Sequence, residues 1–186
     1  MLRRNPRGDF PVVHENAFVD PTAVLCGLIK VEANVFIGPY AVIRADEVDE
    51  NGDMEPIVIG TGSNIQDGVV IHSKDGAAVT IGAHTSIAHR SIVHGPCEVG
   101  SHVFIGFNTV LFNCRVGDNA VVRHNCVVDG HDIPDSFYLP SAKVVTGETD
   151  LASLKTVPAD AREFSESVIH TNVNLATAYR RIQNEF

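Results

Sequence analysis

The chain has 186 residues, enough for one domain with a sizeable hydrophobic core. Its net charge of −9 excludes the clustered basic surface that nucleic acids and anionic membranes reward. No apolar run approaches the ~18–20 residues of a membrane span, and the four cysteines show no Cys-x-x-Cys spacing. We therefore expect a cytoplasmic protein that binds neither nucleic acid nor membrane. Its cysteines should be small buried side chains, namely Cys26, Cys97, Cys114 and Cys126.

A period of six organises the chain after a lead-in over residues 1–18, where Pro6, Gly8 and Pro11 interrupt any regular element. This period fits neither an α-helix nor an alternating strand, and we predict a parallel β-helix over residues 19–140. Interruptions near 47–56 and 73–80 should be loops. The repeating aliphatic residues are Val19, Leu25, Val31, Ile37, Ile43, Ile59, Ile65, Ile71, Ile81, Ile87, Val93, Val99, Ile105, Leu111, Val116, Val122 and Val128.

Glycine follows the aliphatic residue at every third repeat, at Gly60, Gly82, Gly100 and Gly117. Three repeats therefore make one coil, and we expect glycine to stack along an edge where the backbone turns tightly. The sequence predicts a three-sided prism of between five and six coils, with stacked aliphatic side chains as its core.

The repeat is expected to stop near Pro134 and Pro140, before a connector over residues 141–160 with a short helical turn at 150–154. A C-terminal amphipathic helix is predicted over residues 161–184. Its apolar positions should dock along the prism or on a partner, and they are Phe164, Val168, Thr171, Leu175, Tyr179 and Ile182.

Counting three repeats to a coil predicts which residues lie above one another on the same face of the prism. His72 and His94 each follow a core residue and are three repeats apart, with Arg44 three repeats earlier. These residues should form one column, with neighbours separated by about 4.8 Å. Asp67 and His89 should form a second column on a different face, with Gln66 beside it. Since one chain then cannot easily bring three histidines together, a rotational trimer would place the second column against the first column of a neighbour, pairing Arg44 with Asp67.

Three histidines with an open fourth position are a typical catalytic zinc site. The metal lowers the pKa of its bound water towards neutrality. Gln66 could orient the resulting hydroxide by hydrogen bonding.

At these residues the sequence resembles the γ-class carbonic anhydrases, the left-handed β-helix branch of the hexapeptide-repeat proteins. The matching segments are residues 44–47, 64–72, 86–96 and 172–176, and the similarity extends from about Asp20 to Tyr179. The histidine segments are specific, whereas the repeat itself is shared with acyltransferases.

The resemblance implies reversible hydration of CO2 to bicarbonate by a homotrimer with its metals at subunit interfaces. His72 and His94 of one subunit and His89 of the next would be the ligands. Zn²⁺ is the usual metal, with Fe²⁺ and Co²⁺ as alternatives, since three histidines do not discriminate among them. The remaining implied roles are orientation of the hydroxide by Gln66, an interface pair of Arg44 with Asp67, and a site lined by Asp46, Glu47, Asn64 and Asn172.

The chain departs from the family after His72. The best-studied branch has a long acidic loop there with a proton-shuttling glutamate, whereas residues 73–78 are short and contain no glutamate. We hypothesise that Glu47, an acid of the loop over residues 48–55, or His170 carries protons instead.

Three functions are compatible with the sequence. The first is carbonate dehydratase, with Phe107 and Phe112 as apolar wall above His89 and His94. The second is a non-catalytic metal-bound scaffold or regulatory protein, and the third is a hexapeptide acyltransferase, which needs only one catalytic histidine.

Overall fold

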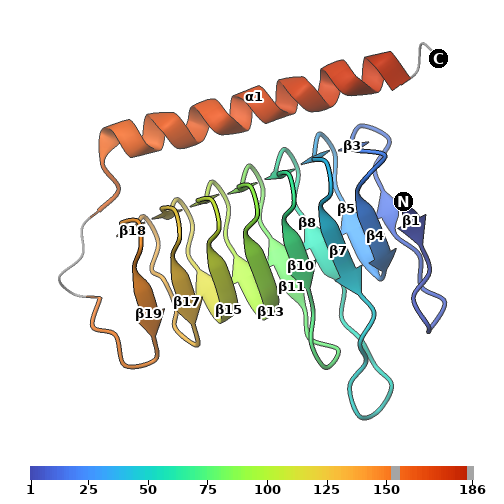
Figure 1. Ribbon diagram of the computed structural model, residues 1–186, viewed down its shortest axis with the longest axis horizontal. Coiled ribbons are helices and arrows are strands. Elements are labelled where there is room, and N and C mark those ends of the chain that lie inside the picture. The colour runs from blue at the N-terminus through green and yellow to red at the C-terminus, as the bar shows by residue number, and fades with distance from the viewer. Residues whose placement is uncertain (152–155, 184–186) are drawn as a thin grey trace.

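The computed structural model describes residues 1–151 and 156–183. Parallel strands stack side by side along the long axis, and one helix runs along the outside of the stack (Figure 1). The prediction of a three-sided parallel β-helix with a C-terminal helix is confirmed. No helix among the described residues is long and apolar enough to cross a membrane.

Three faces make up the prism, and each is a ladder of parallel strands. Face 1 contains β1 (Leu2–Arg3), β4 (Val24–Gly27), β7 (Val42–Ala45), β10 (Val70–His72), the first half of β13 (Ile92–Val99) and of β15 (Val110–Val116), β17 (Val127–Asp129) and β19 (Val144–Thr146). Face 2 contains β2 (Val12–Val13), β5 (Ile29–Val31), β8 (Ile57–Ile59), β11 (Val79–Ile81) and the second halves of β13 and β15. Face 3 contains β3 (Phe18–Val19), β6 (Phe36–Ile37), β9 (Asn64–Ile65), β12 (Ser86–Ile87), β14 (Phe104–Ile105), β16 (Val121–Val122) and β18 (Tyr138–Leu139).

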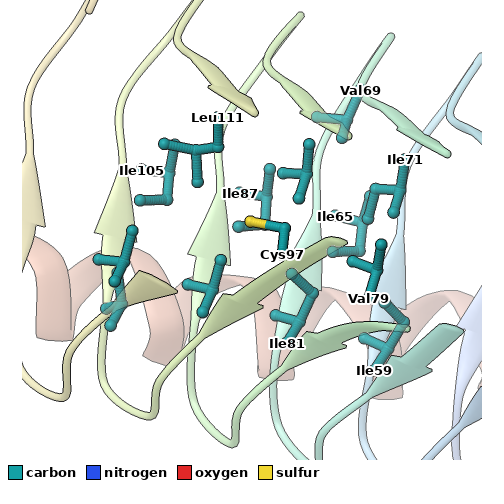
Figure 2. Packing of buried hydrophobic residues seen from close by; sticks show 14 of the residues in the cluster. Ile59, Ile65, Val69, Ile71, Val79, Ile81, Ile87, Cys97, Ile105 and Leu111 are labelled. Atoms are coloured by element: carbon teal, nitrogen blue, oxygen red, sulfur yellow. The ribbon is translucent and has the colours of Figure 1, made fainter. Parts of the chain in front are cut away.

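The core is the predicted aliphatic ladder. Every repeat position from Leu25 to Val128 is at most 2% exposed, and Val19 is partly buried against the same cluster. Figure 2 shows these side chains pointing inward and stacking coil on coil, with Ile65, Ile87 and Ile105 in one row. All four cysteines are buried, as predicted, and the sulfur atoms of Cys97 and Cys114 lie 3.8 Å apart in register on neighbouring coils.

The stack is longer than predicted at both ends. The lead-in forms the first coil, because β1 and β2 pair with β4 and β5. At the other end Ile133, Leu139 and Val145 continue the buried ladder. Within the described residues, face 1 therefore has eight strands and face 3 has seven, rather than the five to six coils expected.

The two prolines that were expected to end the repeat belong to the last coil. One coil below Pro134 the equivalent residue is Gly117, whose N–H donates to the carbonyl of Ile133 on the coil above. One coil below Pro140 the equivalent residue is Arg123, whose N–H donates to the carbonyl of Leu139. In the described chain no further coil lies above Pro134 and Pro140 to accept such a bond. Proline, which has no N–H, therefore costs nothing there.

The stacked glycines occupy the predicted edge for a different reason. Positive φ angles are absent from all four of these glycines: Gly60, Gly82, Gly100 and Gly117. They occur instead two residues later along the chain, as at Gly62 and His84. A Cβ atom on Gly82 would instead lie 2.5 Å from the carbonyl carbon of Gly100 on the next coil. Close approach of neighbouring coils, rather than a tight turn, requires glycine here.

The C-terminal helix α1 (Ala159–Gln183) docks along face 3 of its own chain, contacting β3, β6, β9, β12 and β16. Tyr179 stacks on Phe18 with ring centres 4.9 Å apart, and Phe164 packs edge-on against Phe104 at 5.3 Å. Its buried residues are small: Ala161, Ser165, Asn172 and Ala176. The large apolar residues of the predicted stripe remain 37–48% exposed along its flank, because the helix approaches the sheet too closely to place them beneath it: Phe164, Leu175, Tyr179 and Ile182.

The helix spans nearly the predicted range, although residue 184 lies outside the described residues. The predicted helical turn at 150–154 falls mostly on residues 152–155, which also lie outside them. The interruptions near 47–56 and 73–80 are loops that leave the stack, at residues 46–56 and 73–78 (Figure 1).

Replacing Gly82 with alanine should lower the free energy of unfolding by about 1–3 kcal/mol, because the new methyl group has to push two backbones apart. Gly147→Ala is the matched control, since the nearest atom to its Cβ would be at an ordinary 3.7 Å. Urea denaturation measures both. Equal unfolding midpoints would contradict the close-approach explanation.

Candidate metal centre

The predicted first column exists on face 1. Arg44, His72 and His94 are in register on β7, β10 and β13, so His72 and His94 are direct neighbours on adjacent coils. Their rings meet edge to face, with Nδ1 of His72 3.3 Å from Nε2 of His94. The stacking of coils thus brings two potential ligand nitrogens together.

In each ring, the contacts of the nitrogen that faces away from the other histidine bear on which nitrogen has the proton and which has a lone pair for a metal. Nδ1 of His94 lies 3.1 Å from the carbonyl oxygen of Gly95, which can only accept, so Nδ1 has the proton and Nε2 has the lone pair. Nε2 of His72 lies 3.2 Å from Asp46 Oδ1 and 3.4 Å from Glu47 Oε1. The same Nε2 also lies 3.2 Å from the donor Nη2 of Arg44, so acceptors and a donor both contact it. A metal bound through Nδ1 of His72 would require the proton on Nε2, where the two carboxylates can accept it.

This donor pair fits a tetrahedral metal ion. Two nitrogen ligands about 2.0–2.1 Å from such an ion lie roughly 3.3–3.4 Å apart, which matches the observed 3.3 Å. Among the described residues, however, no group of three or more His, Cys, Asp or Glu side chains is arranged to hold a metal. One chain therefore supplies two facing nitrogens and lacks a third.

His89 lies on the other side of a corner of the prism. It follows β12 on face 3, and the chain turns at Arg90, which has a φ of 61°, before entering β13 on face 1. The predicted second column is present, because the N–H of Arg90 bonds to the carbonyl of Asp67 and Nδ1 of His89 lies 3.8 Å from Asp67 Oδ1. His89 and Asp67 are both about half exposed on the outside of the corner.

Arg44 and Asp67 are not paired within one chain. The guanidinium of Arg44 contacts Asp46 instead, with Nη1 3.2 Å from Oδ2, and its Nη2 lies 3.2 Å from His72 Nε2. The arginine therefore belongs to the same polar cluster as the histidine pair. Its predicted interface partner lies on the other column.

A chain of hydrogen bonds positions Gln66. Its side-chain amide donates to Asn64 Oδ1 at 2.9 Å, and the amide of Asn64 donates to Ser86 Oγ at 2.8 Å. All three side chains are buried, so each bond satisfies a group that water cannot reach. The Gln66 carbonyl oxygen remains available as an acceptor. Sequence reasoning missed Ser86, although its position three repeats after Asn64 could have indicated it.

Gln66 and His89 face a cleft of about 440 Å³ between face 3 and α1. Asn172 lines this cleft from the helix, as predicted, and its amide donates to the carbonyl of Val168 at 2.9 Å. Phe107 also lines it, with its ring centre 5.3 Å from that of His89. Phe112 lies beside His94 at 5.4 Å. The two aromatic residues thus pack against the imidazoles from the next coil, with their ring planes tilted.

The residues considered as proton shuttles differ in their distance from the histidine pair and in their surroundings. His170 lies on the opposite flank of α1, where it lines a different cavity with His84 and His102. In the acidic loop, the main-chain N–H groups of Asp53 and Asn51 hold the pKa of Asp49 below its usual value, which makes Asp49 a poor proton carrier at neutral pH. Glu47 is 46% exposed and in contact with His72. Glu47 thus both contacts the histidine pair and reaches solvent, whereas the proton-shuttle role of Glu47 and of the other loop acids stays a prediction.

Replacing Ser86 with alanine should lower the free energy of unfolding by about 1–3 kcal/mol, because the buried Asn64 amide loses its acceptor. Thermal or urea denaturation measures this. Ser167→Ala, which changes an exposed serine lining the same cleft, should stay within about 0.5 kcal/mol of the parent. Similar losses in both variants would show that the buried hydrogen-bond chain does not hold Asn64.

Comparisons with known proteins agree with this arrangement. The model of the family "Bacterial transferase hexapeptide (six repeats)" matches residues 78–113. A carbonic anhydrase from Methanosarcina thermophila is 36% identical over 95% of this chain and 77% of its own length. The carboxysome assembly protein CcmM from Nostoc is 34% identical over 90% of this chain, which spans only 31% of that longer protein.

Among solved structures, a putative acetyltransferase from Bacillus cereus superimposes with a TM-score of 0.82, covering 98% of both chains. Its sequence identity of 19% shows a shared fold and does not bear on the reaction. The extensive match to the archaeal enzyme, together with the histidine column and the hexapeptide stack, shows that this chain belongs to the γ-class carbonic anhydrase family.

Proposed function

We propose that this protein hydrates CO2 reversibly to bicarbonate at a metal centre shared between subunits of a homotrimer. The observation that carries the proposal is the pair of facing nitrogens of His72 and His94, spaced for a metal ion in a chain whose described residues provide no third ligand beside them. His89 of a neighbouring subunit would complete the set, with Zn²⁺, Fe²⁺ or Co²⁺ as the ion.

An apolar stripe on face 1 supports the trimer. The outward positions two residues before the functional column are all aliphatic and in register, from Val24 through Ile92 to Val144. Equivalent outward positions on face 2 are mostly polar, and include Lys30 and Glu98. Helix α1 covers face 3, whereas no described element covers face 1. Most residues of this stripe are partly exposed, and Ile92 and Val144 are exposed. A continuous apolar stripe at the surface is typical of an interface.

The residues around the histidine pair have distinct roles in this proposal. When bound, the metal supplies a water molecule whose pKa is lowered to about 7, so that hydroxide can attack CO2 near neutral pH. Gln66, held through Asn64 and Ser86, accepts a hydrogen bond from the attacking group and orients it. Asn172 lines the same cleft, Phe107 and Phe112 exclude water, and Glu47 passes the proton to solvent.

In the trimer, Arg44 would exchange some of its contact with Asp46 for Asp67 of the neighbour. Arg44 on the first column is positively charged and Asp67 on the second column is negatively charged, which favours that pairing. The cytoplasmic location expected from composition also remains a prediction.

A non-catalytic scaffold is the second candidate. It is favoured by the absence of a glutamate from residues 73–78 and by the similarity to a carboxysome assembly protein. An acyltransferase is supported by fold alone, and gives no role to the buried chain from Ser86 to Gln66.

Stopped-flow CO2 hydration on protein loaded anaerobically with Fe²⁺, Co²⁺ or Zn²⁺ should show metal-dependent turnover. His89→Ala and His72→Ala should each lose activity at least 100-fold, because each removes a ligand. Mixing and refolding the two variants together should restore about one quarter of the sites, since an interface with one intact half from each chain occurs at that frequency in random trimers.

The mixture separates the alternatives. No recovery on mixing, with one metal bound per chain, would contradict a shared site. Silence of the parent protein with every metal, despite stoichiometric binding, would favour the scaffold.

Ile92→Glu should dissociate the trimer, because it buries an unpaired charge in the apolar stripe, which costs roughly several kcal/mol per interface. Thr80→Glu introduces the same charge at an outward position of face 2 and should leave the assembly intact. Sedimentation velocity distinguishes trimer from monomer. Equal behaviour of the two variants would mean that face 1 is not the interface.

A further inference from the structure

We propose that His124 of one subunit donates a hydrogen bond to Asp129 of its neighbour, forming a second cross-subunit contact two coils beyond the metal ligands. This inference rests on the trimer proposed above. The metal and the two phenylalanines, Phe107 and Phe112, would then lie between two polar contacts. Arg44 and Asp67 form the contact on one side, and His124 and Asp129 form the contact on the other.

Both columns of the metal centre continue towards the C-terminal end of the prism. On face 1, His94 is in register with Phe112 and Phe112 with Asp129. At the corner, the ring of His89 packs tilted against Phe107 with ring centres 5.3 Å apart, and Phe107 stacks on His124 at 4.5 Å. Each column therefore consists of polar or ligand residues, then one phenylalanine, then one polar residue.

In the proposed trimer, the shared metal would set the offset between the two columns along the prism axis. His89 has to approach both His72 and His94 of the neighbour, one coil apart, so its column is displaced by about half of the ~4.8 Å coil spacing. Regular stacking carries this displacement along the prism. Asp67 then faces the gap between Arg44 and His72, and His124 faces the gap between Phe112 and Asp129.

A main-chain hydrogen bond orients His124 as a donor. The N–H of Phe107 donates to Nδ1 of His124 at 3.0 Å, so this nitrogen has the lone pair and the proton is on Nε2 at the other side of the ring. Burial, with a contribution from Arg123, lowers the pKa of His124, which keeps the ring neutral. Arg123 itself is directed towards α1, with its guanidinium 5.6 Å from the ring centre of Phe164.

Asp129 is the matching acceptor. It is exposed on face 1 at the end of β17, two residues after Val127 of the apolar stripe. Its carboxylate makes no hydrogen bond or ion pair with any residue that the structure describes. Covering face 1 with a second subunit would remove water from this charge, which is costly unless the neighbour provides a donor. The Nε2–H of His124 meets that requirement.

Subunit exchange between differently labelled, Zn²⁺-loaded trimers, followed by energy transfer, tests the contact through a double-mutant cycle. His124→Ala and Asp129→Asn should each speed exchange by about tenfold, because a leaving subunit breaks two interfaces and weakening one hydrogen bond contributes about threefold at each. The double variant should exchange no faster than the faster single variant, because both changes remove the same contact. Asp129 is exposed, so Asp129→Asn tests the proposal even where His124→Ala folds poorly.

Two controls change the same residue types away from face 1. His102→Ala alters the ring stacked on His84 at the other corner, and Asp75→Asn alters the exposed acid beside Lys74. Neither should change exchange. Exchange unaffected by the His124 and Asp129 substitutions, or accelerated about hundredfold in the double variant through independent effects, would overturn the contact.

The outcome separates this contact from the proposed function. Coupled exchange in a protein without CO2 hydration would support the contact and reject the enzyme. A protein that is monomeric at every concentration would reject both.

Discussion

The in-register stacking of one coil on the next is the constraint on which the rest of the structure depends. Each coil donates main-chain hydrogen bonds to the coil above, and each aliphatic repeat residue packs on its equivalent one coil away. The spacing is tight enough that Gly82 and Gly100 cannot have side chains. A residue's position in the repeat therefore decides both its face and its neighbours.

The histidine pair is a direct consequence of this register. His72 and His94 meet because they occupy the same repeat position on adjacent coils, where their nitrogens lie 3.3 Å apart. His89 is only five residues before His94, yet a corner of the prism separates them. Because this corner leaves His89 half exposed on the outside of the prism, the described part of one chain does not bring the three histidines together.

Polar groups in the prism are tolerated where they satisfy one another. Ser86, Asn64 and Gln66 form a buried chain of hydrogen bonds that ends at the cleft beneath α1. Such a chain holds the Gln66 amide in one orientation, and loss of any member leaves a buried group without a partner. The helix contributes mainly small residues against face 3, which keeps Asn172 close to this cleft.

The sequence by itself determined the repeat, the three faces, the core and the histidine column, because a period of six residues maps directly onto a stacked coil. It misplaced the ends of the stack, since Pro134 and Pro140 signal a break by local rules and only the absence of a coil above them makes them acceptable. The tertiary structure alone decided that small residues of α1 face the prism, that His170 lies away from the cleft, and that Ser86 anchors Asn64. These features depend on the distance between helix and sheet and on side-chain directions, which a one-dimensional pattern does not contain.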